Sequence, residues 1–321
     1  MYIPPFTITA PIMRLVVDIA ETIGKLSAQR DDYISSPRLR KNNQIKTIHS
    51  SLAIEHNSLS LQQVTDVIEG KHVLGMPNEI QEVRNALQAY QLMPQLNAFN
   101  EQDLLRAHGL MMAGLVERAG HYRAGGVGVF DGERCIHLAP PAERVPELMH
   151  DLFEWVAKTD VHPLISSCVF HYEFEFIHPF EDGNGRMGRF WQTMLLSRYQ
   201  PMFAWIPVET IVKEHQQDYY DAIAQSDKNG DSTSFITFML QCLLTSMKQY
   251  TIDKVADKVA DKTERNILTI IRNNPSVTTL EMARRLKMSD SGVRKVIMSL
   301  KSRGLLRRIG ANKNGHWEVV E

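Results

Sequence analysis

The sequence has few cysteines and no long apolar run. Cys135, Cys168 and Cys242 are scattered over 321 residues, and no Cys-x-x-Cys pair occurs. We therefore expect the protein to reside in the reducing cytoplasm and to contain neither a disulfide framework nor a cysteine-ligated zinc site. No apolar run reaches the roughly 18 residues that a membrane-spanning helix needs. Met1 to Ala10 lacks the basic and apolar regions of a signal peptide. We expect a cytoplasmic protein with no membrane partner.

The chain also has almost no net charge, with 36 basic and 37 acidic side chains. The two signs are unevenly distributed. From Lys262 to Glu321 there are 13 Lys and Arg against 5 Asp and Glu, so residues 1 to 261 hold 23 against 32. A basic tail that follows an acidic body favours a polyanionic partner for the tail.

A polar, glycine-rich stretch lies between two apolar segments. It runs from His178 to Arg189 and reads HPFEDGNGRMGR. The apolar spacing of Pro163 to Ile177 and of Phe190 to Tyr199 predicts a core helix on each side. Gly183 and Gly185 allow the backbone to approach a ligand closely. Several N–H groups at the start of the second helix can then point at one anion, so the stretch predicts a phosphate cradle.

Four side chains of this stretch supply the other parts that phosphoryl or nucleotidyl transfer requires. Arg186 and Arg189 are three positions apart and lie on one face of the first helical turn, where they suit phosphate or carboxylate oxygens. Asp182 is a hard oxygen ligand for Mg²⁺. Histidine exchanges a proton readily near neutral pH, which makes His178 the natural general base. A plain helix connection would explain each residue alone, but not all four together.

These residues resemble the signature of the Fic family, His-x-Phe-x-(Asp/Glu)-Gly-Asn-Gly-Arg-x-x-Arg, at every fixed position. The resemblance implies an enzyme that transfers the AMP of ATP to a Ser, Thr or Tyr hydroxyl of a target protein, with Mg²⁺ as cofactor. His178 would deprotonate the hydroxyl and Asp182 would hold Mg²⁺. The nucleotide phosphates would be bound by the rest of the signature: Gly183, Asn184, Gly185, Arg186 and Arg189. Of the two arginines, Arg186 would grip the β-phosphate and Arg189 would meet the γ-phosphate.

An earlier segment resembles the inhibitory motif of the same family, (Ser/Thr)-x-x-x-Glu-(Gly/Asn). Ser51 and Glu55 match it, but His56 follows where the family has Gly or Asn, and Asn57 comes next. The resemblance implies that Glu55 pairs with Arg189 and excludes the γ-phosphate. A histidine enters the left-handed conformation less readily than glycine, so we expect a differently shaped helix end. From spacing alone, these residues describe an ordinary helix end.

Two adjacent tyrosines, Tyr219 and Tyr220, lie in a helical segment from Glu209 to Ala224. Adjacent tyrosines predict one in the core and one at the surface. Similar tyrosines in the family lie near the adenine, so the resemblance implies that one of these stacks on the base.

A short hairpin is predicted between His121 and His137, where glycines interrupt a run of β-forming residues. In the family, a hairpin flap lies beside the active site and aligns the target by strand addition. The expected flap edge consists of Arg134, Cys135, Ile136, His137 and Leu138. A plain surface hairpin is the alternative.

The predicted fold is mainly α: a Fic-type helical bundle with a short β-hairpin flap, followed by a small winged-helix domain. We predict an N-terminal helical region with the inhibitory motif at 1–100, a catalytic core at 101–250, a helical linker at 251–261 and a winged helix-turn-helix domain at 262–321. The basic residues of the last domain would face phosphates of duplex DNA: Arg294, Lys295, Lys301, Arg303, Arg307, Arg308 and Lys313. Protein docking is the alternative for this domain.

Three functions stay open. The first is AMP transfer to a protein, restrained by Glu55. The second is removal of AMP by the same site, with Glu55 orienting a water molecule. The third is a transcription regulator whose Fic-like body is a sensor. The intact signature favours the first, and Gly185 and Arg189, which kinase-like relatives lack, favour AMP transfer over kinase chemistry. The target protein and the formation of a homodimer stay open as well.

Overall fold

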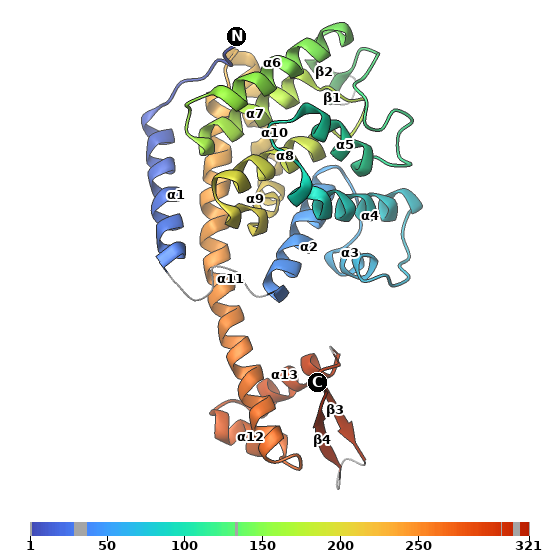
Figure 1. Cartoon of the computed structure of the whole chain (residues 1–321), viewed down its shortest axis with the longest axis vertical. Helices are drawn as coiled ribbons and strands as arrows, with labels where there is room; N and C mark the ends of the chain where they lie inside the picture. Colours follow the sequence, from blue (N-terminus) through green and yellow to red (C-terminus); the bar gives the residue numbers. More distant parts are fainter. Residues whose placement is uncertain (1, 29–36, 132–133, 303, 311–314, 321) are drawn as a thin grey trace. The chain divides into compact units, whose positions relative to one another are not determined.

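The computed structural model describes residues 2–28, 37–131, 134–302, 304–310 and 315–320, with side chains left undescribed at 128–138 and 254–261. The chain forms two compact units, Met1–Tyr250 and Thr251–Glu321 (Figure 1). A long helix, α11 (Thr233–Asn273), contributes residues to both units. Among the described helices, none combines the length and the apolar character needed to cross a membrane.

The first unit is almost entirely helical. Its helices before the hairpin are α1 (Ala10–Ala28), α2 (Pro37–Ile54), α3 (Leu61–Ile68), α4 (Pro77–Leu92), η1 (Met93–Gln95) and α5 (Glu101–Met111). Those after the hairpin and before α11 are η2 (Ala142–Arg144), α6 (Val145–Lys158), α7 (Pro163–Ile177), α8 (Asn184–Tyr199), η3 (Pro201–Trp205), α9 (Val208–Glu214) and α10 (Gln216–Asn229).

Helices α7 and α8 form the centre of this unit and pack against each other. Nearly every residue of α7 is buried, as expected for a helix that is apolar on all sides. The largest fully buried side chains include Phe170 and Phe174 of α7 and Phe190 and Trp191 of α8. Helix α2 packs against α8 and α9, and the residues at its C-terminal end contact Arg189 of α8.

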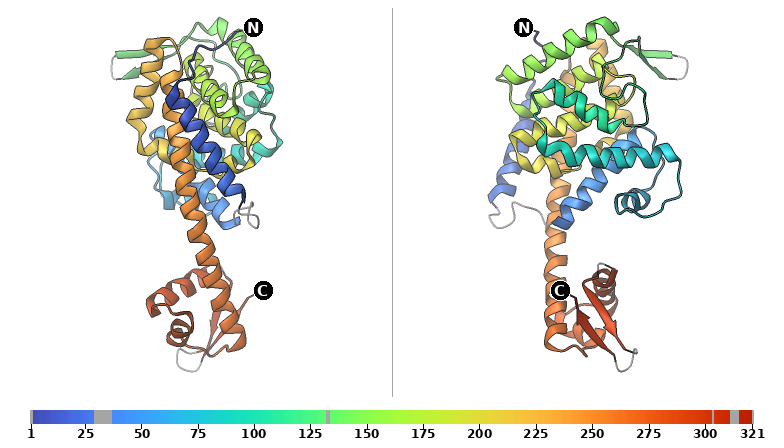
Figure 2. Two further views of the ribbon diagram at one scale, coloured as in Figure 1. Left: turned by 90° about the vertical axis from the view of Figure 1, so that its left-hand side faces the viewer. Right: turned by 45° about the vertical axis from the view of Figure 1, so that its right-hand side comes forward.

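The predicted hairpin consists of β1 (Gly128–Asp131) and β2 (Arg134–Leu138), which pair antiparallel. Val129 pairs with His137 and Phe130 with Cys135, so Ile136 is an extra residue that forms a bulge. Figure 2 shows the hairpin projecting from the edge of its unit in both views. In the described part of the chain, β2 pairs with β1 alone.

The second unit contains the end of α11, α12 (Thr279–Leu286), α13 (Asp290–Ser302) and the antiparallel strands β3 (Leu306–Ile309) and β4 (His316–Val319). Thr278 caps α12 by accepting a hydrogen bond from Glu281 N at 3.2 Å. The unit has its own apolar core, with Ile267, Met282 and Val293 at its centre. The predicted fold class, mainly α with a helical bundle and a small hairpin followed by a winged helix, is confirmed.

Several residues predicted to face DNA have partners within the second unit. Arg294 donates to Asp290 at 2.6 Å, Arg307 pairs with Glu318, and Arg308 lies over the ring of Trp317 at 4.6 Å from its centroid. Arg303 and Lys313 lie outside the described residues.

Candidate active site

The loop between α7 and α8 takes its course from two left-handed residues. His178 ends α7 with φ 50°, and Gly183 precedes α8 with φ 83°. A Cβ atom at Gly183 would lie 2.6 Å from the sulfur of Met112. Both the backbone angle and the packing therefore require glycine at this position.

Phe180 anchors this loop in the core. Its ring is fully buried and stacks on His108 with the ring centroids 3.6 Å apart. The amide of Asn184 accepts from Phe180 N and donates to Phe180 O, both at 2.9 Å. The side chain of Asn184 therefore holds the loop, which leaves its backbone N–H for the predicted contact with a phosphate.

His108 holds the same loop from the side of α5. Its Nδ1 accepts a hydrogen bond from Gly120 N at 2.8 Å, so Nε2 carries the proton and donates to Asp182 O at 3.1 Å. Burial lowers the pKa of His108 to about 4, although the hydrogen bond to Asp182 raises it. His108 is therefore neutral near pH 7, and it does more than fill the core.

Arg123 is a buried arginine that belongs to none of the predicted motifs. Its guanidinium donates to His178 O and Gly125 O, both at 2.8 Å, and to Pro140 O at 2.5 Å. The backbone N–H of Arg123 donates to Pro179 O at 2.9 Å. Gly125 and Pro140 flank the hairpin, so one side chain ties the base of the hairpin to the start of the loop. The only signal in the sequence is a lone arginine among several glycines.

His178 is half-buried and faces the loop. Its Nδ1 lies 3.3 Å from Glu175 O. A carbonyl oxygen only accepts, so this contact places the proton on Nδ1 and the lone pair on Nε2. That tautomer is the one a general base requires.

Arg186 is buried, and its two terminal nitrogens face two carboxylates. Nη2 lies 2.9 Å from Asp182 Oδ1, and Nη1 lies 3.2 Å from Glu82 Oε1. The side chain of Asp182 is 59% exposed, whereas that of Glu82 is 20% exposed. Glu82 belongs to α4, far from the signature in sequence, and no motif in the sequence marks it.

Arg189 is also buried, and its described hydrogen bonds all go to the end of α2. Nε donates to Ser51 Oγ at 3.1 Å, and Nη2 donates to Ser51 O at 3.0 Å and to Glu55 Oε1 at 2.7 Å. Burial is the largest single influence on the pKa of Arg189 and lowers it, but the charge of Glu55, the hydrogen bond to Glu55 and the nearby Tyr219 and Glu175 together raise this pKa above its ordinary value. The structure thus forms the predicted pair of Glu55 with Arg189 and adds Ser51 as a further partner of this arginine.

The end of α2 has the geometry of a Schellman motif, which fixes the position of Glu55. Asn57 N donates to Leu52 O at 3.1 Å and His56 N donates to Ala53 O at 3.3 Å. His56 has φ 68°, in the left-handed region that glycine usually occupies at this position. From the sequence we expect His56 to give the helix end a different shape. Instead α2 ends in the usual Schellman geometry, and His56 is held in a conformation that is strained for a residue with a Cβ atom.

Gly185 allows Glu55 to approach the first turn of α8. A Cβ atom at Gly185 would collide with Glu55 Oε1 and would lie 2.9 Å from Arg189 Nη1. Any larger residue at this position would displace one of the two partners.

The two tyrosines divide as predicted. Tyr219 is 2% exposed, and its hydroxyl lies 3.2 Å from His171 Nε2. Tyr220 is 40% exposed, and its hydroxyl donates to Ile54 O at 3.4 Å. Tyr219 thus belongs to the core and Tyr220 to the surface, and of the two only the ring of Tyr220 is exposed. Stacking of one of them on an adenine stays a prediction.

A polar network lies beneath the loop. His171 Nδ1 lies 2.7 Å from Gln192 Oε1, and its Nε2 lies 3.7 Å from Glu175. Burial opposes ionisation of Glu175, but His171, His178 and Arg189 together lower its pKa. Glu175 therefore contributes a negative charge beneath the two histidines.

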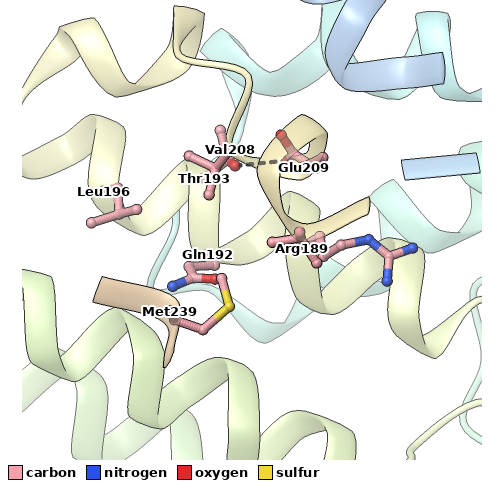
Figure 3. Close-up of a pocket in the computed structure, with 8 residues that line it drawn as sticks. Arg189, Gln192, Thr193, Leu196, Val208, Glu209 and Met239 are labelled. Carbon is pink, nitrogen blue, oxygen red and sulfur yellow. Dashed lines mark hydrogen bonds between the residues drawn. The ribbon is translucent and has the colours of Figure 1, made fainter. Parts of the chain in front are cut away.

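A small cavity of about 10 Å³ borders Arg189 on the inner side (Figure 3). It is lined by polar and apolar side chains: Arg189, Gln192, Thr193, Leu196, Val208, Glu209, Val212 and Met239. This volume is at the lower limit for one water molecule, so the cavity cannot hold a nucleotide. Glu209 accepts from Thr193 at 3.3 Å, and burial raises the pKa of Glu209 to about 7.

Asp182 is the residue that fits a Mg²⁺ ion accompanying a nucleotide. Among the described residues, no group of three or more His, Cys, Asp or Glu could hold a metal ion by itself. An exposed carboxylate at the start of α8 suits a cation that takes its other ligands from phosphate oxygens and water.

Sequence and fold are both similar to those of Fic proteins. The Fic/DOC family model matches residues 98–196, and a model for winged helix-turn-helix DNA-binding domains matches residues 261–307. A crystal structure of a Fic family protein from Desulfovibrio desulfuricans G20 shares 43% sequence identity with this chain, at a TM-score of 0.77. That similarity covers 99% of this chain and 98% of the other. Fic-1 from C. elegans, at 19% identity and a TM-score of 0.63, shares the fold.

Curated relatives match a shorter part of their own length. Protein adenylyltransferase Fic of Nematostella vectensis is 28% identical over 253 residues, which are 72% of this chain and 56% of that protein. The protein of the same name from Aedes aegypti is 28% identical over 238 residues, 70% of this chain and 45% of that protein. The chain thus spans about half the length of the curated relatives it matches.

Proposed function

Because the chain belongs to the Fic family, we propose that it transfers AMP from ATP to a hydroxyl side chain of a target protein, and that Glu55 restrains this transfer. The supporting observation is the arrangement around one loop. His178, with the lone pair on Nε2, stands at one end of the loop, and the N-terminus of α8 with Arg186 and Arg189 stands at the other.

In the proposed reaction, His178 Nε2 accepts the proton of the target hydroxyl while the hydroxyl oxygen attacks the α-phosphorus. A bond forms between this oxygen and phosphorus, the bond from the α-phosphorus to the bridging oxygen breaks, and pyrophosphate leaves. The N–H groups at the start of α8 face the negative charge that develops. Asp182 would hold Mg²⁺, which shields the charge of the phosphates.

The proposed restraint follows from the donors of Arg189. The described hydrogen bonds that Arg189 donates go to Ser51 and Glu55. A γ-phosphate therefore has to displace Glu55 before it can bind this arginine. The Glu55 carboxylate also repels the phosphate. ATP bound beside an intact Glu55–Arg189 pair would lie poorly aligned for attack on its α-phosphorus.

For the second unit we propose binding to duplex DNA. Support comes from the match of residues 261–307 to winged helix-turn-helix DNA-binding domains and from the excess of basic residues after Lys262.

The test of AMP transfer is incubation with α-labelled ATP and Mg²⁺ in a cell lysate, using wild type, Glu55→Gly and Glu55→Gly/His178→Ala. We expect labelled protein, at least self-labelling, with Glu55→Gly. We expect its loss in the double variant, since a missing general base costs about 10² to 10⁴ in rate. Release of AMP from prelabelled protein by wild type, lost in Glu55→Gly, would instead favour AMP removal, because Glu55 would orient the water in that reaction. Absence of transfer by Glu55→Gly together with absence of removal by wild type would leave the transcription-regulator alternative.

A further inference from the structure

We propose that Glu82 is a positioning residue for Arg186. It holds this arginine from the buried side of the site, so that the other side of the guanidinium meets the β-phosphate of a bound nucleotide. The inference rests on the function proposed above and deepens it, because it names what orients a nucleotide-binding arginine. Glu82 itself touches no nucleotide in this assignment.

The exposed fractions of the two carboxylates around Arg186 indicate from which side of the guanidinium a ligand enters. Asp182, against Nη2, is 59% exposed, and Glu82, against Nη1, is 20% exposed. A ligand that enters from solvent therefore reaches the Asp182 side of the guanidinium. Glu82 stays behind Arg186 and can keep its contact while Nη2 exchanges a carboxylate for a phosphate oxygen.

Residue 82 has to accept hydrogen bonds on both of its oxygens. Glu82 Oε1 faces Arg186, and Oε2 accepts from Asn57 Nδ2 at 2.7 Å. The orientation of Asn57 is itself set, because its Oδ1 accepts from Leu59 N at 3.1 Å and its Nδ2 also donates to Glu79 O at 3.1 Å. Only a carboxylate can accept on both sides, so a glutamine at this position would lose one of the two contacts.

This chain of contacts begins at the helix end that carries Glu55. Asn57 is buried and closes the Schellman motif of α2 through its backbone N–H. The same helix end thus contacts Arg189 directly, through Glu55, and Arg186 indirectly, through Asn57 and Glu82. Both nucleotide-binding arginines of the proposed site depend on one turn of backbone.

The test compares ADP with AMP by calorimetry on the full chain. ADP has a β-phosphate for Arg186 and no γ-phosphate for Glu55 to oppose, so the ratio of the two affinities reports Arg186. We expect wild type to bind ADP more tightly than AMP. Glu82→Ala should lower the affinity for ADP about tenfold, as expected for loss of a contact to a charged group, and should leave the affinity for AMP within about twofold. Glu82→Gln, which keeps the size of the side chain, should give a smaller loss of the same kind.

Glu79→Ala is the matched control. Glu79 is on the same helix and holds the same loop, since its Oε1 accepts from Ser58 N at 2.6 Å, but that contact is not to an arginine. We expect this variant to keep the wild-type preference for ADP. An equal loss of preference in Glu79→Ala would overturn the inference, because the loop alone would then explain the effect.

Two further results separate the inference from its premise. If wild type prefers ADP and both Glu82 variants keep that preference, the role of Glu82 is wrong while the proposed function stands. If wild type binds ADP and AMP equally, the assignment of Arg186 to the β-phosphate fails, and the role of Glu82 fails with it.

Discussion

At the scale of single residues, the candidate site consists of charges that are paired before any ligand arrives. Arg189 has Glu55, and Arg186 has Asp182 and Glu82. The sequence located the arginines, Asp182 and Glu55, because each belongs to a short motif with fixed spacing. It did not locate Glu82 or Arg123, since both act across long sequence separations and no local pattern marks them.

The Glu55–Arg189 pair yields a prediction about rate. Glu55→Gly should raise AMP transfer strongly, on the order of 100-fold, since misplacement of reacting groups by about 1 Å can cost that much. The gain in ATP affinity should be smaller. Adding Arg189→Ala should remove the gain, because the released arginine is what aligns the phosphates. Transfer rates measured over a range of ATP concentrations check this, and equal rates for wild type and Glu55→Gly would refute the restraint.

Glu209 yields a prediction about pH. Burial raises its pKa from 4.5 to about 7, so the folded protein keeps a proton that the unfolded chain releases earlier. Stability therefore falls as pH rises from about 4.5 to 7. Glu209→Gln removes this loss and should stabilise the protein by about 1–3 kcal/mol at pH 8, with little change at pH 4.

Denaturant unfolding at the two pH values measures this difference. Glu173 provides a comparison, since burial raises its pKa to about 7 as well. Glu173→Gln should produce its own gain at pH 8, and the double variant should have the flattest pH profile. A Glu209→Gln gain of equal size at both pH values would point to packing instead of ionisation.

At the scale of elements, the end of α2 shows how backbone hydrogen bonding can override the preference of a single residue. A histidine directly after a helix disfavours positive φ, yet His56 takes φ 68°, the backbone angle that the Schellman motif requires at this position. The predicted helices on each side of the signature were right, because their apolar spacing is long and regular. Pairing details such as the bulge at Ile136 depend on contacts that spacing does not contain.

This strain can be measured by substitution. His56→Gly should stabilise the protein by about 1 kcal/mol, because glycine adopts positive φ without the steric cost of a Cβ atom. The control is His56→Ala, which keeps the Cβ atom and should show no comparable gain. Thermal unfolding of both variants separates the effect of removing the imidazole from the effect of relieving backbone strain at position 56. A gain in the alanine variant as large as that in the glycine variant would contradict the prediction.

At the scale of the whole molecule, two units with separate cores carry different charge. The composition predicted the division of charge, and the match to winged helix-turn-helix domains agrees with the predicted class of the second unit. Roles of single basic residues were harder to predict, since Arg294, Arg307 and Arg308 have neighbours within the unit. Those contacts depend on the register of β3 with β4 and on the turn of α13.

The second unit should bind duplex DNA with a steep dependence on salt, because basic side chains release counterions from the phosphates. Fluorescence anisotropy of the full chain with a labelled duplex, at 50 and 200 mM salt, measures the slope. Lys295→Gln and Lys301→Gln should each weaken binding to unrelated sequences alike, whereas Lys213→Gln in the first unit should not. Absence of binding at low salt would favour protein docking.

Gly185 contributes both to the proposed restraint and to the proposed phosphate cradle, which limits the mutations that can be tolerated at this position. Any side chain at this position meets Glu55 and Arg189, and the same glycine belongs to the proposed phosphate cradle. If the proposed function holds, a mutation here that loosens the restraint would also damage the phosphate cradle, so its carrier would gain no unrestrained activity. The proposed restraint could be lost through Glu55 or Ser51, whereas at Gly185 selection for a working enzyme would also preserve the restraint.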